Sequence, residues 1–393
     1  MIYLCLYGLL LLLAMTDMVK PVNNKRANAI MLALIVVFAL FRGLRWDTGT
    51  DWESYLDLYK NSSFTNIFSF DRYGNGAEMM EPGIVLINAV FNTIFPYTIY
   101  LIASNAFILW AYKKAVCYFL PRRRVFAFCF LILTVAFFPV RQEIANAIIL
   151  LSLPSMLKRD YKKFILLSLL AVSIHKSAAF MIPVIFVVDR IKLSPPFLYA
   201  IFFSSLVLGV TVIQSLAARF APLIIAMNAG FEHNIEYYTE TIAEDAGIGI
   251  VGLVMPLFLI TLGCFARNKS HKLNCSEEYN LFLKLMTVFF SLNILLGSTG
   301  LTQLMRLTKY LFFADAFVLA YVANSFCDFK QAFWRAKVPL FAMMLLVAIL
   351  GINRFNNKCQ SYPELMFPYI SVFSDDKRNE TPVEFDYSML FNN

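Results

Sequence analysis

The chain has 393 residues, of which 59% are hydrophobic and 15% are charged, and its formal net charge is +8. The mean hydropathy of +0.65 exceeds what one water-soluble core can bury, which excludes an ordinary soluble globular protein. Apolar stretches of about 20 residues, the length that crosses a bilayer, recur along nearly the whole chain. The sequence therefore predicts an all-α, polytopic integral membrane protein.

These stretches predict a bundle of about 10–13 transmembrane helices in one membrane domain, residues 1–352. In chain order they are 1–15, 28–44, 83–112, 125–140, 142–157, 164–188, 197–214, 248–266, 281–298, 306–326 and 338–352. The first stretch lacks the basic start and the small-residue cleavage site of a signal peptide, so we expect a retained helix. Residues 353–393 are expected to form an extracytoplasmic C-terminal tail.

The positions of lysine and arginine predict the orientation of the chain, because cytoplasmic loops carry an excess of these residues. They gather at 20–26, 113–124, 158–163, 267–272 and 330–337. The loops 45–81 and 215–247 are acidic overall and alternate correctly with the basic loops. We therefore place these two long loops outside. The net positive charge is explained by topology, and no nucleic-acid partner is expected.

Two segments conflict with a simple series of crossings. Residues 83–112 are too long for one crossing, which predicts a helix broken near Pro96 with 83–95 partly re-entrant. Residues 164–188 run between two basic loops and therefore need an even number of crossings. We expect a helical hairpin or re-entrant pair there, with the sequence SIHKS at 173–177 as its tip.

With this topology, polar residues from five distant parts of the chain fall at or near the outer face. They are Arg45 through Tyr55, Glu81 through Gly83, Arg141 with Gln142, His175 with Lys176, and Arg306. Ionisable groups at the edge of the apolar layer are costly to place, and their default interpretation is a functional site. We predict an outward-opening site for a polar, anionic ligand.

Purely structural interpretations of the first motif remain open. Arg42 and Arg45 could snorkel from the end of the helix 28–44. The run Thr48-Gly49-Thr50-Asp51 is also ordinary chemistry for a turn and a helix start.

The other motifs have similar alternatives. Glu81 before Pro82 resembles a helix start, and His175 could be a satisfied buried imidazole. Arg141 is different, because we expect it at a helix N-terminus, where the helix dipole disfavours a cation. Arg306 is likewise expected in an unfavourable place for a cation, at the outer end of a helix. The positions of both arginines therefore favour a functional interpretation.

Several common catalytic motifs are missing from the sequence. There is no phosphate-binding loop, no dinucleotide fingerprint and no HExxH pair. Seven cysteines are scattered without paired spacing, which predicts neither disulfides nor a metal site. We therefore expect no metal and no cofactor.

The order of the polar motifs resembles the EpsG family of polysaccharide-synthesis membrane proteins. The matching motifs are R-x-x-T-G-T-D-aromatic-x-x-Y from Arg45, E-x-G at 81–83, R-Q-x-x-A at 141–145, H-x-S at 175–177 and R-x-x-x-Y at 306–310. The resemblance covers about residues 28–325. It departs from the family at Trp52, where tyrosine is commoner, and in the tail 353–393.

The family is similar to the Wzy class of repeat-unit polymerases. The resemblance therefore implies an enzyme of the glycosyltransferase type that polymerises polyprenyl-diphosphate-linked oligosaccharides at the outer face of a bacterial inner membrane. Its products would be exopolysaccharide, capsule or O-antigen chains. A flippase and a chain-length regulator of the same pathway are the expected partners.

This chemistry needs cations for the leaving diphosphate and a base for the attacking hydroxyl. The base candidates are Asp51, Glu81 and His175. The expected substrate-binding residues are Arg45, Thr48, Gly49, Thr50, Trp52, Tyr55, Arg141, Gln142, Lys176, Arg306 and Tyr310. Among the cations, Arg45, Arg141 and Arg306 are expected to hold diphosphate. The aromatic rings of Trp46, Trp52 and Tyr55 would suit sugar stacking.

Two other functions remain open at this point. A membrane acyltransferase acting on the glycan could use His175 as its base. A flippase or transporter of lipid-linked glycan would use the same arginines, but it should also carry a polar track that reaches the cytoplasmic side.

Overall fold

The computed structural model describes residues 2–49, 52–71, 79–138, 141–191, 193–209, 250–297, 306–327, 333–360 and 369–374. Within these residues almost every element is a helix, and the only β-type pairings are two isolated bridges. Among the described residues, three helices are long and apolar enough to cross a membrane: α1 (Ile2–Val19), α2 (Asn24–Gly43) and α15 (Glu277–Gly297). The prediction of an all-α membrane helix bundle is confirmed.

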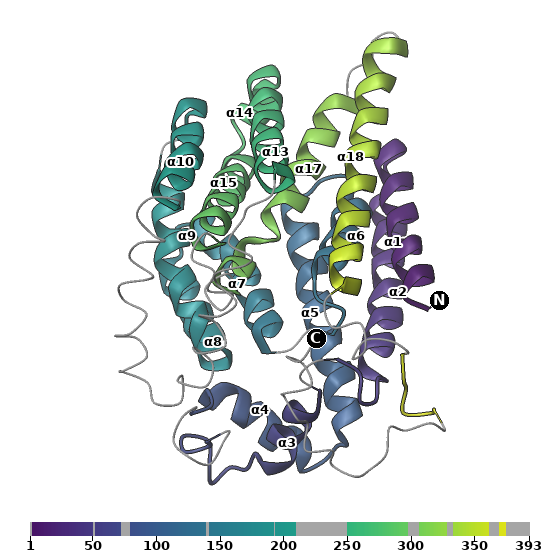
Figure 1. Cartoon of the computed structure of the whole chain (residues 1–393), viewed down its shortest axis with the longest axis vertical. Coiled ribbons are helices and arrows are strands. Elements are labelled where there is room, and N and C mark those ends of the chain that lie inside the picture. Colours follow the sequence, from purple (N-terminus) through teal and green to yellow (C-terminus); the bar gives the residue numbers. More distant parts are fainter. Residues whose placement is uncertain are drawn as a thin grey trace.

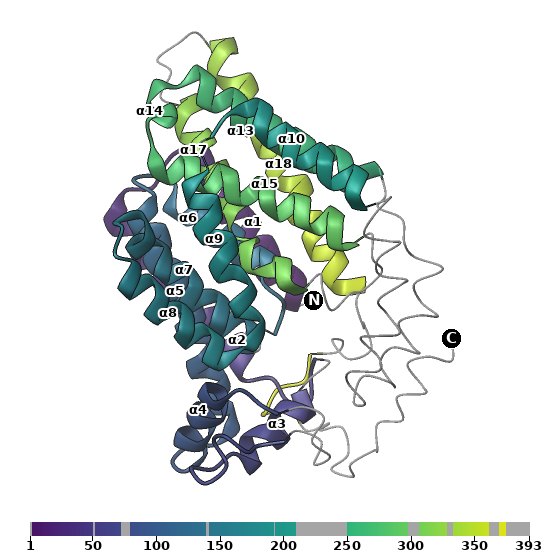
Figure 2. The same cartoon turned by 90° about the vertical axis from the view of Figure 1, so that its left-hand side faces the viewer.

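The remaining elements define a bundle with two distinct ends. They are α3 (Trp52–Asn61), α4 (Pro82–Asn92), α5 (Tyr97–Phe119), α6 (Arg124–Thr134), α7 (Arg141–Leu157), α8 (Tyr161–Ile174), η1 (Lys176–Phe180), α9 (Met181–Arg190), α10 (Pro195–Leu208), α13 (Ile250–Lys269), α14 (His271–Asn274), η4 (Lys309–Leu311), α17 (Ala314–Cys327) and α18 (Phe333–Gln360). Figures 1 and 2 place α3 and α4 together at one end of the bundle and α14 at the other. The predicted outer loop 215–247 lies outside the described residues.

The helix expected to break near Pro96 does so. Helix α4 ends at Asn92, and Pro96 is the residue that precedes α5. Proline is suited to this position because it lacks an N–H group and its fixed φ is already compatible with a helix start. The break leaves α4 beside α3 at one end of the bundle (Figure 1).

Residues 164–188 form the expected hairpin. Helix α8 ends at Ile174, His175 is extended with φ −153°, and η1 leads directly into α9. An ion pair between Arg159 and Asp189 joins the start of α8 to the end of α9. The two legs therefore begin and finish at the same end of the bundle, and the tip at 173–177 lies at the opposite end.

The core of the bundle is built around α6. Every residue from 125 to 133 in this helix is apolar and buried. Helix α6 packs on α1, α2 and α17, whereas the outer helices expose apolar side chains such as Leu12 on α1 and Ile352 on α18. Apolar exposure on the outside of a helix bundle is what contact with lipid requires.

Three helix boundaries differ from the hydropathy pattern. Helix α6 ends at Thr134 instead of continuing to residue 140, and the stretch 306–326 is interrupted by η4. Helix α18 runs from Phe333 to Gln360, beyond the predicted stretch 338–352. Hydropathy placed its end too early because polar residues in its last turns have partners inside the bundle, as described below.

The segment 369–374 returns to the start of the first long loop. The N–H of Trp46 donates to the carbonyl of Ile370 at 2.9 Å, and the N–H of Val372 donates to the carbonyl of Leu44 at 2.9 Å. The end of α2 is thereby attached to a segment more than 300 residues later in the chain.

Candidate functional site

The carboxylate of Glu81 is the centre of a buried polar cluster. It accepts a hydrogen bond from Arg141 Nη1 at 2.8 Å and from the backbone N–H of Lys176 at 2.9 Å. His175 Nδ1 lies 3.1 Å from Oε1 of Glu81, the same oxygen that accepts from Lys176. The Glu81 side chain is 6% exposed. This contact set, which we call the Glu81 cluster, comprises Glu81, Arg141 and His175.

Gly83 allows the Glu81 cluster to form. A Cβ atom at this position would lie 2.6 Å from the carbonyl oxygen of Ser173, which is closer than any real Cβ contact. Glycine therefore lets the start of α4 approach the tip of the α8–α9 hairpin. Because Glu81 precedes Pro82 at the start of α4, this close approach brings its carboxylate to His175.

The environment of Glu81 favours its ionised form. Burial alone would raise the pKa of its carboxyl group, but the hydrogen bond with His175, the charge of Arg141 and the Lys176 N–H lower the pKa to about 2. Such a weakly basic carboxylate is unsuited to removing a proton from a sugar hydroxyl at neutral pH. Its contacts suit it to orient His175 instead.

The contact with Glu81 fixes the two ring nitrogens of His175 in different roles. An ionised carboxylate can only accept hydrogen bonds, so Nδ1 carries the proton that it shares with Glu81. In the neutral imidazole the other nitrogen, Nε2, is then an acceptor that can take a proton from a bound hydroxyl. A carboxylate that holds a histidine in one tautomer is a recurrent arrangement in general-base catalysis.

Arg141 is the first residue of α7, and it connects the Glu81 cluster to α3. Its Nε donates to the hydroxyl of Tyr55 at 3.2 Å, and its guanidinium carbon lies 5.9 Å from the centre of the Tyr55 ring. Nη1 also lies 3.3 Å from the sulfur of Met80. These contacts fix the fork of the guanidinium at the helix N-terminus.

The fifth motif lies against the same place. The side chain of Gln142 donates to the carbonyl of Arg306 at 2.7 Å, and the hydroxyl groups of Ser177 and Tyr310 are 2.9 Å apart. The side chains of Lys176 and Arg306 are exposed. Two exposed cationic residues are therefore attached through their backbones to Glu81 and Gln142, and such cations could meet an anionic substrate.

Glu143 is a buried acid that the sequence interpretation missed. Its Oε2 accepts hydrogen bonds from Tyr112 at 3.2 Å and from Asn146 at 3.1 Å. Asn146 also donates to the carbonyl of Lys309, which ties α7 to η4. The available signal was an acid followed three residues later by an amide within an apolar helix.

Arg45, Thr48 and Gly49 pack against the segment 369–374 and the residues before α7. The Arg45 guanidinium carbon lies 4.5 Å from the centre of the Phe138 ring, and the Thr48 hydroxyl donates to the carbonyl of Trp46 at 2.9 Å. Gly49 has φ +108°, and a Cβ there would lie 3.0 Å from Arg45 Nη1. The turn therefore lies close against the Arg45 guanidinium, and a side chain at residue 49 would crowd it. Thr50 and Asp51 lie outside the described residues.

Trp52 is buried in an aromatic cluster that holds α3 against α5. Its ring centre lies 4.9 Å from that of Trp46 and 5.9 Å from that of Tyr97. Only 5% of Trp52 is exposed. Internal packing is therefore the role that these contacts give to Trp52, and its sugar contact stays a prediction.

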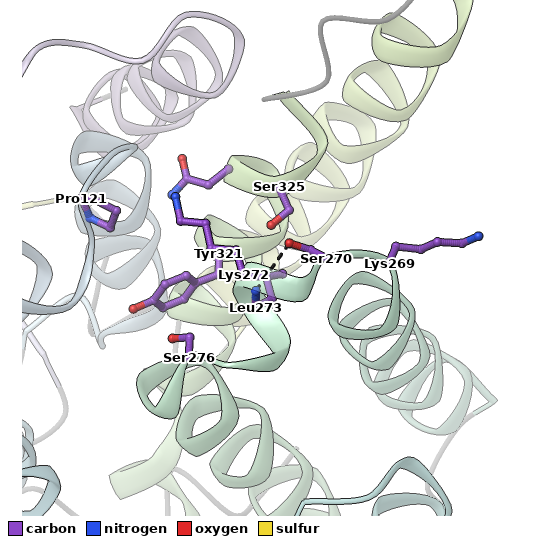
Figure 3. Close-up of a pocket in the computed structure, with 9 residues that line it drawn as sticks. Pro121, Lys269, Ser270, Lys272, Leu273, Ser276, Tyr321 and Ser325 are labelled. Carbon is purple, nitrogen blue, oxygen red and sulfur yellow. Dashed lines mark hydrogen bonds between the residues drawn. The ribbon is translucent and has the colours of Figure 1, made fainter.

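A cavity of about 260 Å³ lies at the other end of the bundle. Ser270, Lys272 and Tyr321 line it, and Figure 3 shows them around the start of α14. None of the five sequence motifs contributes to its lining, so the Glu81 cluster is the stronger candidate for the chemistry. Within the part of the chain that is described, no group of three or more His, Cys, Asp or Glu side chains could hold a metal ion.

The fold and the cluster together define a multi-pass membrane protein with a polar site at one end of its helix bundle. A family model described as the EpsG family matches residues 28–371, so the chain belongs to the EpsG family. It is accordingly a membrane protein of polysaccharide biosynthesis. No curated protein and no solved structure matches the chain.

Proposed function

We propose that the protein joins polyprenyl-diphosphate-linked oligosaccharide repeat units into a polysaccharide chain at the outer face of the bacterial inner membrane. The observation that carries this proposal is the contact of Glu81 with both His175 and Arg141. It supplies an oriented base in a site that also presents exposed cations. Membership of the EpsG family supports the same pathway.

In the proposed reaction, the acceptor hydroxyl transfers its proton to Nε2 of His175. Its oxygen bonds to the anomeric carbon of the donor sugar, the bond from that carbon to the diphosphate oxygen breaks, and the electron pair leaves with the diphosphate. The exposed cations Lys176 and Arg306 stabilise the departing negative charge. Glu81 stays ionised and holds the imidazolium that forms.

The residues 45–55 support this site. Tyr55 contacts Arg141 directly, and Arg45 packs on Phe138, three residues before Arg141. Asp51 stays a second candidate base, and the Thr48-Gly49-Thr50 turn a candidate anion contact. A flippase and a chain-length regulator would be the functional partners of such a polymerase.

The proposal is tested in a strain that lacks the gene. Single repeat units should remain on the lipid and long chains should be absent, and His175→Gln should fail to restore them. Removing a well-placed base slows proton transfer by about 10²–10⁴-fold. The matched control is His271→Gln, which changes an exposed histidine on α14 at the other end of the bundle and should restore normal polymer.

The product pattern decides between this and other functions. Full-length polymer that lacks a decoration in the deletion strain would indicate an acyltransferase. Lipid-linked units trapped on the cytoplasmic side would indicate a flippase. Normal polymer from His175→Gln at normal protein level would remove His175 from the reaction.

A further inference from the structure

One fully buried and two half-buried basic side chains lie on the α3–α4 side of the bundle. Arg42 is in the last turn of α2, while Arg354 and Lys358 are near the end of α18. Both helix ends point toward α3 and α4 in Figure 1. We call Arg42, Arg354 and Lys358 the basic cluster. Cations inside a membrane bundle are rare and usually mark a functional site.

Two members of the basic cluster have partners within the protein. Arg354 forms an ion pair with Asp315 on α17 and also donates to the hydroxyl of Thr134. Lys358 Nζ donates to the carbonyl of Leu133 and lies 5.2 Å from the centre of the Tyr7 ring. These contacts hold the two cations of α18 in place beside α2.

Arg42 is different. It is 0% exposed, yet none of its three guanidinium nitrogens has a hydrogen-bond partner among the described residues. The Phe38 ring centre lies 5.6 Å from the guanidinium carbon. The hydroxyl of Tyr7 lies close enough to interact with Arg42, although the two groups do not meet in hydrogen-bond geometry. Buried polar groups are normally satisfied, and one tyrosine hydroxyl can accept from only a small part of the five N–H donors of arginine, so the Arg42 donor set calls for a further acceptor.

The charges around Arg42 favour an anion as that acceptor. Glu143 is within electrostatic reach of Arg42 and Lys358, but its Oε2 is occupied by Tyr112 and Asn146. The other acid, Asp315, is paired with Arg354. The three basic side chains thus lie among two acidic ones, and both acids already have other partners. The planar fork of arginine is well matched to the oxygens of a phosphoryl group.

We propose that the basic cluster binds the phosphoryl headgroup of a membrane lipid, with Arg42 as the principal donor. Helix α18 exposes apolar residues such as Leu345 and Ile349 on its outer side, so the cluster lies behind a surface suited to lipid. This step rests on the proposed polymerisation, in which two lipid-linked substrates take part. The basic cluster would bind the diphosphate of one substrate, and Lys176 and Arg306 would bind the diphosphate of the other.

The test measures the thermal stability of the full-length protein in nanodiscs of neutral lipid. The probes are inorganic diphosphate, farnesyl diphosphate and phosphatidylglycerol, compared in wild type, Arg42→Gln and Lys358→Met. We expect farnesyl diphosphate to stabilise the wild type, with an apparent affinity about tenfold weaker in each variant. Lys358→Met provides the same test if Arg42→Gln does not fold.

Arg124→Gln is the matched control, because the Arg124 guanidinium already donates to the backbone carbonyls of Leu120 and Cys117. Its response to farnesyl diphosphate should equal that of the wild type. A response to phosphatidylglycerol that needs Arg42 would also support the site and would identify a phospholipid as its source. A response to inorganic diphosphate alone would overturn a lipid headgroup as the ligand.

Equal responses of all proteins to every probe, or no response at all, would overturn the proposal and leave Arg42 as a hydrated structural residue. Polymer formation is a separate readout. If lipid binding depends on Arg42 but the protein makes no polymer, the anion site is supported and the proposed polymerase function is contradicted. If the protein makes normal polymer but shows no binding that depends on Arg42, the polymerase function is supported and the anion site is contradicted.

Discussion

The Glu81 contact makes one ring nitrogen of His175 a donor and leaves the other as an acceptor. Replacing Glu81 by Gln keeps the shape of the side chain but removes its charge, so the histidine tautomer is no longer enforced. We expect polymer formation to slow by up to about 10⁴-fold, because neutralising a carboxylate that holds a catalytic histidine in one tautomer has an effect of that size. The double variant with His175→Gln should be no slower than His175→Gln alone, because both changes affect one unit. Independent, multiplied losses would separate the two residues.

The same carboxylate predicts a dependence of stability on pH. The pKa of Glu81 falls from an ordinary value of 4.5 to about 2 in the folded protein, so its ionisation stabilises the fold fully above pH 4.5. This contribution, roughly 3 kcal/mol by the linkage relation, is lost as the pH falls toward 2. Thermal unfolding of wild type and Glu81→Gln between pH 6 and pH 3 should show their difference in melting temperature shrinking below pH 4.5. A constant difference would contradict the lowered pKa.

Residues that are unusual for their surroundings were recognisable in the sequence. Glu81, Arg141 and His175 stand out because charge is rare in this chain, and the structure brings all three into contact. For Arg42 the sequence left open whether the side chain snorkels to the membrane surface or belongs to a functional site, because its burial depends on neighbours from other helices. Glu143 was missed for the same reason, because its partner Tyr112 is 31 residues away.

At the scale of elements, the close approach of α4 to the hairpin tip should be sensitive to a single methyl group. In Gly83→Ala the new Cβ would meet the backbone of Ser173, and relieving that contact moves Glu81 away from His175. We expect a loss of about 1–3 kcal/mol in stability together with strongly reduced polymer. Both are measured by thermal unfolding and by gel analysis of the polysaccharide.

Gly8 in α1 provides the control, because a Cβ there would meet nothing within 4 Å. Gly8→Ala should keep full activity, since alanine is also the better helix former. A normal Gly83→Ala protein would show that the α4 approach is not needed for the site.

The hydropathy pattern predicted helix boundaries well where the length of an apolar stretch and a proline within it determine the boundary, as at Pro96. It missed α3, because this helix is short and amphipathic and lies beside α4 at one end of the bundle instead of crossing it. It also ended α18 too early, because Arg354 and Lys358 look like water-exposed residues until Asp315 and Leu133 are seen beside them.

At the scale of the whole molecule, the charge pattern predicts which end of the bundle faces outward. In a cysteine-free background, Asn61→Cys on α3 should react with a membrane-impermeant thiol reagent in intact spheroplasts. Lys163→Cys at the start of α8 should react only after permeabilisation, because its loop is basic. Both positions are exposed, so accessibility alone does not explain a difference. The reverse pattern would invert the orientation.

The pairing of residues 44–48 with 369–374 also bears on the order of synthesis. The ribosome makes the turn that carries Arg45 and Thr48 early, but the carbonyl of Ile370 that receives the Trp46 N–H is made only after all the described helices. This part of the first long loop therefore reaches its final contacts near the end of translation. A nascent chain halted before residue 369 would have inserted those helices while the turn still lacked its last partner.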